Sequence, residues 1–162
     1  MTPFNVAIVR WIRGAFDFRG RSTRAEYWWP RALVALVNLT LLMTFIVGGG
    51  ADWLAALVEW SEQDPMPTDF SGLDLPPLPG LAKFAAVFYG VFGVLTFFPD
   101  LAVAWRRFHD LSQPGWLHLV FMVFSPLFVF VIVLELAWFI VPGTKGPNRY
   151  GPDPLEAQAD AF

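Results

Sequence analysis

Three long apolar stretches, at residues 28–47, 81–104 and 116–141, alternate with connecting segments that carry most of the charges. Each stretch has about 20 residues or more, the length that an α-helix needs to cross a ~30 Å hydrocarbon core. The pattern predicts an all-α membrane protein with three transmembrane helices. Because three helices leave no room for a second core, we expect a single transmembrane helical domain over residues 1–154 and a flexible C-terminal tail at 155–162.

The charges are sorted by segment, and this sorting predicts the orientation. The first 31 residues hold six arginines, whereas the 50–80 connection has several acidic residues and no basic one. Cationic residues that flank a span are retained on the inner side of the membrane. We therefore expect a cytoplasmic N-terminus, an outer loop at 50–80, and a return to the cytoplasm at Arg106 and Arg107.

The third apolar stretch allows two interpretations, because Pro126 lies near its middle. A single tilted or kinked crossing is preferred, since a broken helix exposed to lipid would leave backbone groups unpaired. This interpretation places the C-terminus outside. The alternative is a re-entrant hairpin that breaks at Ser125-Pro126 and returns the C-terminus to the cytoplasm.

Two shorter amphipathic segments flank the first span. Residues 4–18 place their apolar side chains on one helix face, which predicts either an in-plane helix at the inner membrane surface or a helix packed under the bundle. Residues 53–60 repeat apolar positions at helical spacing and predict a short interfacial helix in the outer loop. Beyond it, residues 61–80 are rich in proline and acidic residues, which favours an extended or mobile loop.

The start of the first membrane helix carries a local signal. Thr23 and Glu26 have the Thr-x-x-Glu spacing of a capping box, so we expect the helix to begin near Arg24. Pro30 then lies inside this helix and is expected to kink it near the interface.

Four charged residues lie within the predicted spans, where a charge is costly and needs a partner. Arg31 and Asp100 are expected at the inner level, and Lys83 and Glu135 at the outer level. The matching depths predict two interhelical ion pairs, Arg31–Asp100 and Lys83–Glu135. Because the middle of the membrane region is nearly all apolar, these pairs are expected to hold helices together rather than to form an ion path.

Three polar motifs lie at the ends of the spans: Phe18 to Trp28, Arg106 to Leu111 followed by Gly115-Trp116, and Gly146 to Pro154. Together and in this order they resemble the bacterial domain-of-unknown-function family 805, small inner-membrane proteins of the YhaH type. The resemblance implies a bacterial inner (plasma) membrane location and no assigned activity. Read physically, Arg106 and Asp110 are expected to pair across one helical turn, and Pro114-Gly115 to form a tight turn.

The motifs also supply the candidate site residues. Their charged and polar side chains could contact other proteins or the phosphates of inner-leaflet lipid headgroups: Arg19, Arg21, Arg24, Glu26, Arg106, Arg107, His109, Asp110, Asn148 and Arg149. A catalytic role of His109 with Asp110 lacks a nucleophile or further metal ligands. Cysteine is absent, which excludes disulfides, thiolate chemistry and Cys-ligated metals.

These observations predict a non-catalytic integral membrane protein, without cofactor or metal, that acts as an accessory or scaffolding subunit. The expected partners are the bilayer, other membrane helices of the same or a larger complex, and anionic headgroups at the inner face; no nucleic acid is expected. One alternative is a lipid-binding or small-solute transport protein that acts as an oligomer. Another is a membrane enzyme that acts on inner-leaflet headgroups.

Overall fold

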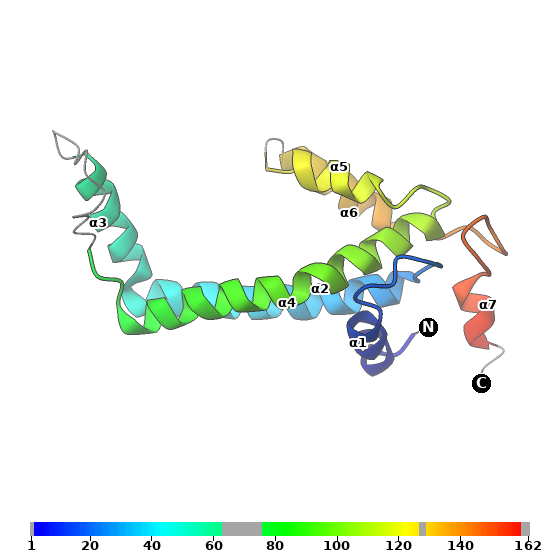
Figure 1. Ribbon diagram of the computed structural model, residues 1–162, viewed down its shortest axis with the longest axis horizontal. Helices are drawn as coiled ribbons and strands as arrows, with labels where there is room; N and C mark the ends of the chain where they lie inside the picture. Colours follow the sequence, from blue (N-terminus) through cyan, green and yellow to red (C-terminus); the bar gives the residue numbers. More distant parts are fainter. Residues whose placement is uncertain (1, 63–75, 127–128, 160–162) are drawn as a thin grey trace. The chain divides into compact units, whose positions relative to one another are not determined.

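The computed structural model describes residues 2–62, 76–126 and 129–159, and the regular elements in these ranges are all helices (Figure 1). The N-terminal part forms α1 (Phe4–Arg13), α2 (Arg24–Phe45), the π-helical segment η1 (Ile46–Gly50) and α3 (Ala51–Ser61). The remainder forms α4 (Gly80–Asp110), α5 (Leu117–Phe124), α6 (Val129–Ile140) and α7 (Pro154–Ala159). The described residues therefore agree with the predicted all-α fold class.

The chain divides into two compact units. Unit 1 comprises Met1–Val34 and Leu95–Phe162, and unit 2 comprises Ala35–Val94. The boundary passes through α2 and through α4, so each long helix contributes one part to each unit. The three polar motifs belong to unit 1.

Two helical stretches are long and apolar enough to cross a membrane, judged by length and composition: Arg24–Ser61 and Gly80–Asp110. The first two predicted spans, residues 28–47 and 81–104, lie within them. α2 alone has 22 residues, and at 1.5 Å per residue it reaches about 33 Å. It is therefore long enough to span the ~30 Å hydrocarbon core.

The start of α2 follows the predicted capping box. The backbone N–H of Glu26 donates to Thr23 Oγ1 at 3.2 Å, and the N–H of Thr23 donates to Glu26 Oε2 at 2.9 Å. α2 begins at Arg24 and contains Pro30, as predicted. These reciprocal bonds satisfy two backbone donors that a helix start leaves unpaired.

A sharp change of direction separates α2 from α3. Gly49, within η1, has a φ of 87°, a left-handed conformation that favours glycine. The helix expected at residues 53–60 is present as α3, whose Trp53 Nε1 donates to the carbonyl of Pro76 at 2.7 Å. The predicted position of α3 at the membrane interface stays a prediction. Most of the predicted 61–80 loop, residues 63–75, lies outside the described residues.

The amphipathic N-terminal segment forms a shorter helix than predicted: α1 ends at Arg13 rather than near Phe18. Its Ala7 and Trp11 are buried, and Trp11 Nε1 donates to Asp100 Oδ1 at 3.0 Å. This face packs on α4 within unit 1, as in the alternative of a helix packed under the bundle. Ile12 stays exposed on α1. An in-plane position at the membrane surface stays a prediction.

The third apolar stretch is not a continuous helix, so the preferred single crossing is wrong in this respect. α5 has 8 residues and α6 has 12, lengths of about 12 Å and 18 Å that are too short to span the core. The two helices pack together, and the ring centroids of Phe121 and Trp138 lie 5.9 Å apart. α5 ends at Phe124, immediately before Ser125-Pro126. Proline cannot donate a backbone hydrogen bond, which explains a break at this point.

Part of the C-terminal tail predicted at 155–162 is helical, and its flexibility stays a prediction. α7 covers Pro154–Ala159, while residues 160–162 lie outside the described residues. Ahead of it, Asn148 and Gly151 form an isolated antiparallel β-bridge, with both N–H···O distances at 3.0 Å. This bridge closes the third polar motif into a compact turn.

Candidate functional site

The carboxylate of Asp110, at the end of α4, lies at the centre of a buried polar cluster. Arg21 Nε donates to its Oδ1 at 3.0 Å, Arg21 Nη2 lies 2.9 Å from the same oxygen, and Arg107 donates to its Oδ2. The side chains of Arg21, Arg107 and Asp110 are 1%, 0% and 6% exposed. Two cations and one anion are thus held together away from solvent.

The same two arginines also bind the backbone of the C-terminal segment. Arg21 Nη1 donates to the carbonyl of Gly146 at 2.6 Å, and its Nη2 donates to the carbonyl of Thr144. Arg107 Nη2 donates to the carbonyl of Phe139 at 3.2 Å and to that of Val141. The carbonyls of Phe139 and Val141 lie at and just after the end of α6, where helix carbonyls lack partners within the helix. The cluster therefore joins the first motif, the end of α4 and the C-terminal segment.

Arg106 binds the N-terminal loop rather than Asp110, so the predicted pair across one helical turn is corrected. Its Nε donates to Ser22 Oγ at 3.1 Å, and its Nη1 donates to the carbonyl of Gly14 at 3.0 Å and to that of Asp17. Asp110 is already occupied by two other arginines. The loop carbonyls supply Arg106 with the acceptors that a buried guanidinium needs.

His109 packs against the third motif. Its ring is stacked on that of Tyr150, with centroids 3.8 Å apart and an interplanar angle of 4°, and its Nδ1 lies 3.0 Å from the carbonyl oxygen of Gly20. Asn148 Nδ2 lies within hydrogen-bond distance of the His109 carbonyl, at 3.0 Å, and of Thr144 Oγ1, at 2.9 Å. His109 and Asn148 thus help to join the same segments as the arginines. We refer to Arg21, Arg106, Arg107, His109, Asp110 and Asn148 as the motif cluster.

The backbone of the C-terminal segment approaches this cluster closely at Gly143, and this approach requires glycine. A Cβ atom built at that position would overlap the carboxylate of Asp110. The backbone N–H of Thr144 donates to the carbonyl of Asp110 at 2.9 Å. The C-terminal segment can therefore lie directly against the end of α4 only without a side chain at this position.

The charged residues of the apolar segments form one of the two predicted pairs. Arg31 Nη1 lies 3.6 Å from Asp100 Oδ2, so the structure brings these two residues together. Glu135, which was predicted to pair with Lys83, instead lies against Nδ1 of His118. The α5–α6 turn places His118 and Glu135 on facing helices, which a single crossing would not do. Lys83 has no ion pair among the described residues.

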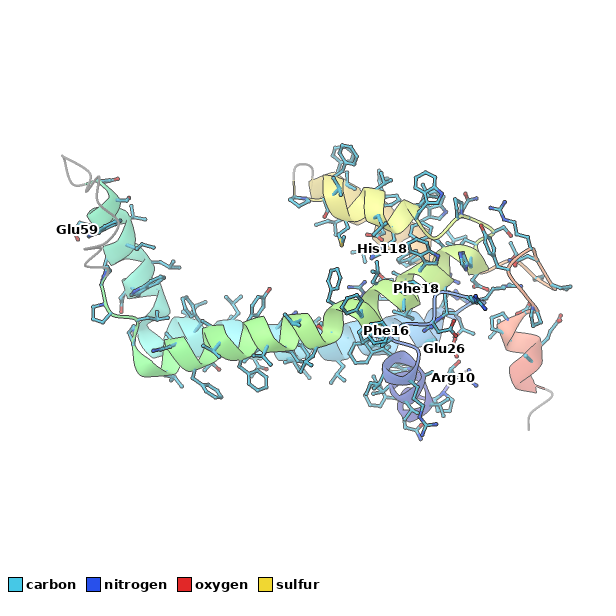
Figure 2. The ribbon with its side chains drawn as sticks, viewed as in Figure 1. Arg10, Phe16, Phe18, Glu26, Glu59 and His118 are labelled. Carbon is cyan, nitrogen blue, oxygen red and sulfur yellow. The ribbon has the colours of Figure 1, made fainter. Side chains whose placement is uncertain are left out.

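The other candidate arginines are exposed, whereas Glu26 is buried. Arg24 Nη1 donates to the carbonyl of Ile140 at 3.4 Å, and Arg149 Nη2 donates to that of Ser112 at 3.1 Å. Arg19 is exposed, and Glu26 pairs with Arg10 of α1, as Figure 2 shows. The structure thus separates the candidate arginines into a buried group bound to the protein and an exposed group that retains access to solvent.

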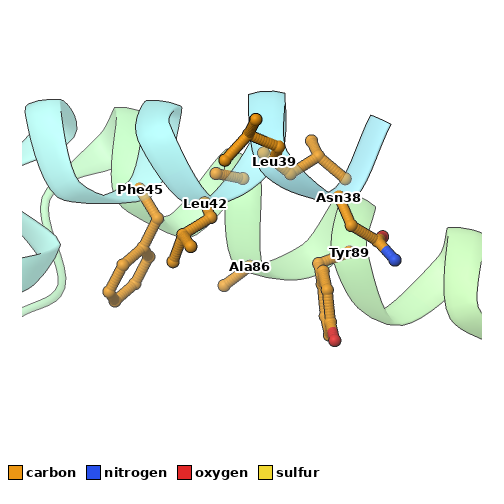
Figure 3. A pocket seen from close by; sticks show the side chains of 8 residues that line it. Asn38, Leu39, Leu42, Phe45, Ala86 and Tyr89 are labelled. Carbon is orange, nitrogen blue, oxygen red and sulfur yellow. The ribbon is translucent and has the colours of Figure 1, made fainter. Parts of the chain in front are cut away.

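Unit 2 contains an apolar groove of about 570 Å³ between α2 and α4 (Figure 3). Its lining is mostly aliphatic and aromatic: Asn38, Leu39, Leu41, Leu42, Phe45, Ala85, Ala86 and Tyr89. Asn38 has the most polar side chain of this lining, and its amide group makes no hydrogen bond with the part of the chain that the structure describes. Sequence analysis missed this groove, although an asparagine in an apolar run is a visible signal.

A family model described as "Protein of unknown function (DUF805)" matches residues 15–152. The chain belongs to this family. The match contains the whole motif cluster, so the residues that join the N-terminal loop, α4 and the C-terminal segment all lie within the family region.

Two relatives from Escherichia coli strain K12 are similar along most of the chain. Inner membrane protein YhaH is 30% identical over 143 residues, which cover 88% of this chain and 91% of the relative. Inner membrane protein YhaI is 33% identical over 143 residues, with 88% and 90% covered. No solved structure matches. The relatives and the two long apolar helices together support a membrane protein.

Proposed function

We propose that this protein is a non-catalytic accessory or scaffolding subunit of the bacterial inner membrane, which binds transmembrane helices of a larger membrane protein. Its N-terminus faces the cytoplasm, because the arginines gather at the N-terminal side of α2 and are absent from residues 50–80. The motif cluster holds the inner part of the chain together, and the apolar parts of α2 and α4 meet the partner.

The use of the charged motif residues supports a structural role for them. Both carboxylate oxygens of Asp110 accept hydrogen bonds from arginines, and the His109 ring is stacked on Tyr150. Arg21 and Arg107 are occupied by Asp110 and by backbone carbonyls. A general base or nucleophile needs access to a substrate, whereas these groups contact their own chain.

The groove in unit 2 carries the proposal. An amide within a membrane span needs a hydrogen-bond partner, because the hydrocarbon core offers none. Asn38 lacks such a partner in the described residues, and the other residues that line the groove are apolar except for Tyr89. A transmembrane helix with a polar side chain at the depth of Asn38 would satisfy the amide and fill the groove.

The small residues of α4 support close approach by a neighbouring helix. Ala86 lines the groove and is exposed, and a Cβ atom built at Gly90 would meet no atom within 4 Å. Small residues let helix backbones approach each other closely in membranes, where packing and hydrogen bonds drive association. We therefore place the partner helix along this side of α4.

The test is purification of the tagged protein in nanodiscs followed by native mass spectrometry. We expect a larger membrane protein in fixed stoichiometry, lost with Asn38→Leu and retained with Thr40→Leu. Thr40 is a matched control, because it lies on the same helix and its Oγ1 bonds the carbonyl of Leu36 within that helix. Asn38→Leu keeps the apolar character of the groove, so loss of the partner would report the missing amide.

Three results would contradict the proposal. Recovery of only copies of this chain would favour the oligomeric alternative instead of an accessory subunit. Retention of the partner by Asn38→Leu would place the interface away from the groove. Equal loss with both variants would indicate a general effect on α2 rather than a specific contact of Asn38.

A further inference from the structure

A second cavity, of about 250 Å³, lies in unit 1 beside α1 and the loop that follows it. It is lined by charged side chains of both signs, with some apolar and small residues: Arg10, Trp11, Gly14, Asp17, Arg19, Gly20, Arg21, Ser22, Glu26, Val103 and Arg106. Four of these residues are arginines and two are acidic, so the lining carries a net positive charge. Such a lining favours an anion.

The arginines of this cavity differ in what they already bind. Arg21 is fully engaged in the motif cluster. Arg106 uses Nε and Nη1 for Ser22 and two loop carbonyls, while its Nη2 makes no hydrogen bond within the described residues. Arg10 pairs with Glu26, but its side chain is 51% exposed. Arg19 is exposed, and its side chain has no hydrogen bond or ion pair within the described residues.

A hydrogen bond also fixes the backbone of Arg19. Its N–H donates to Asp17 Oδ1 at 3.0 Å, and the Asp17 carbonyl in turn accepts from Arg106. The loop that carries Arg19 is therefore tied to α4 at the wall of the cavity. From this position the free guanidinium of Arg19 can donate two parallel hydrogen bonds to a phosphate.

An exposed apolar patch adjoins the cavity. Phe16 lies between the lining residues Gly14 and Asp17 in sequence, its ring centroid is 5.0 Å from that of Phe98, and it is 74% exposed. Figure 2 shows the Phe16 side chain beside α1. Ile12 of α1 is exposed as well. A phospholipid combines a charged phosphate with apolar acyl chains. The charged cavity and the adjoining apolar patch therefore suit the two parts of one such ligand.

We propose that this cavity binds the phosphate of an anionic phospholipid of the inner leaflet, with Arg19 and Arg106 Nη2 as donors and with the acyl chains against Phe16 and Phe98. The site goes beyond the helix-binding role, because none of the groove residues lines this cavity. Its failure would leave that role standing.

The experiment compares lipid retention by variants in nanodiscs that contain phosphatidylglycerol and phosphatidylcholine in equal amounts. Native mass spectrometry at about 0.5 M salt counts retained lipids, since salt at that level screens diffuse attraction beyond several Å. We expect one phosphatidylglycerol per chain in the parent protein. Arg19→Gln should lower its retention about tenfold, as expected for loss of a charged hydrogen bond, and Arg19→Lys should lose less than Arg19→Gln.

Arg13→Gln is the matched control, because Arg13 is an exposed arginine at the end of α1 that does not line the cavity. It should keep the retained lipid within about twofold at the same salt, where diffuse attraction is screened. Equal losses in Arg13→Gln and Arg19→Gln would overturn the proposal in favour of diffuse surface attraction. Retention of phosphatidylcholine at the same level would also overturn it.

A separate arm distinguishes lipid phosphate from free phosphate. Inorganic phosphate is added to the protein in pure phosphatidylcholine nanodiscs, and thermal unfolding is recorded. We expect phosphatidylglycerol to raise the unfolding temperature of the parent protein but not that of Arg19→Gln. If inorganic phosphate raises it in the same Arg19-dependent way and phosphatidylglycerol adds nothing, the lipid assignment is wrong.

Discussion

The motif cluster of unit 1 and the groove of unit 2 differ in how their polar side chains are paired. In unit 1, arginines and acidic residues that are far apart in sequence bind one another and the backbone, as Arg21 and Asp110 do at 3.0 Å. In unit 2, the polar Asn38 lies in an apolar groove without a hydrogen bond to the described residues. The contrast indicates that the charged side chains of the motif cluster find most of their partners within unit 1, whereas in unit 2 the amide of Asn38 is left for a partner.

This difference has an energetic consequence. A buried ion pair contributes little net stability compared with apolar packing, but removing one partner leaves an uncompensated charge and is strongly destabilising. Substitutions in the motif cluster should therefore lower the amount of folded protein. Substitutions at exposed positions of unit 2 should leave folding intact and alter association instead.

The largest expected effect is that of Asp110→Ala. It leaves Arg21 and Arg107 buried without their carboxylate, so we expect a loss of about 3–5 kcal/mol in the free energy of unfolding. Glu59→Ala, at an exposed position of α3, should change it by less than about 0.5 kcal/mol. Denaturation in mixed detergent micelles measures both. If both variants lower the free energy of unfolding by a similarly small amount, the proposed difference between the two units is wrong.

Glycine substitutions sharpen the same comparison. A Cβ at Gly143 would overlap the Asp110 carboxylate, so Gly143→Ala should destabilise the protein by about 1–3 kcal/mol. A Cβ at Gly90 meets open space, so Gly90→Ala should be neutral or stabilise α4 by up to about 1 kcal/mol. Thermal unfolding of the two variants gives the order. The reverse order would mean that the C-terminal segment does not lie against Asp110.

A double-mutant cycle tests whether Arg31 and Asp100 interact. Each single alanine variant should destabilise the protein, and the double variant should cost about 1 kcal/mol less than the sum. Trp11 also donates to Asp100, so part of the carboxylate's environment survives in Arg31→Ala. If the two losses in the free energy of unfolding are strictly additive, Arg31 and Asp100 do not interact at their distance of 3.6 Å.

The smallest expected effect comes from the stacked pair of His109 and Tyr150. His109→Gln removes the stacking and should cost about 1 kcal/mol, whereas Tyr150→Phe keeps the ring and should cost less than about 0.5 kcal/mol. Membrane yield and thermal unfolding measure both. Normal yield, assembly and stability of His109→Gln, together with loss of a cellular phenotype, would favour a ligand-binding or active role for His109.

Sequence reasoning succeeded where the determining contacts are local. The capping box spans only Thr23 to Glu26, and α2 begins at the predicted residue. The paired depths of Arg31 and Asp100 also placed two residues together, because the length of a span fixes the level of its charges.

It failed where contacts depend on how distant segments meet. Arg21 and Asp110 are separated by 89 residues, and nothing near Asp110 indicates that Arg21 rather than Arg106 binds it. The apolar run at 116–141 has the length of a span, and its hydropathy carries no information on whether the helix reverses. Pro126 is the local signal for the break, because proline cannot donate a backbone hydrogen bond.

In the proposed topology, the motif cluster holds the N-terminal loop and the C-terminal segment on one side of the membrane. The most direct measurement is labelling of single cysteines with a membrane-impermeant maleimide, since the chain has no cysteine of its own. Cysteines at Arg13 and Lys145, both exposed, should react from the same side, in inverted vesicles but not in intact spheroplasts. Labelling of these two positions from opposite sides would contradict this topology.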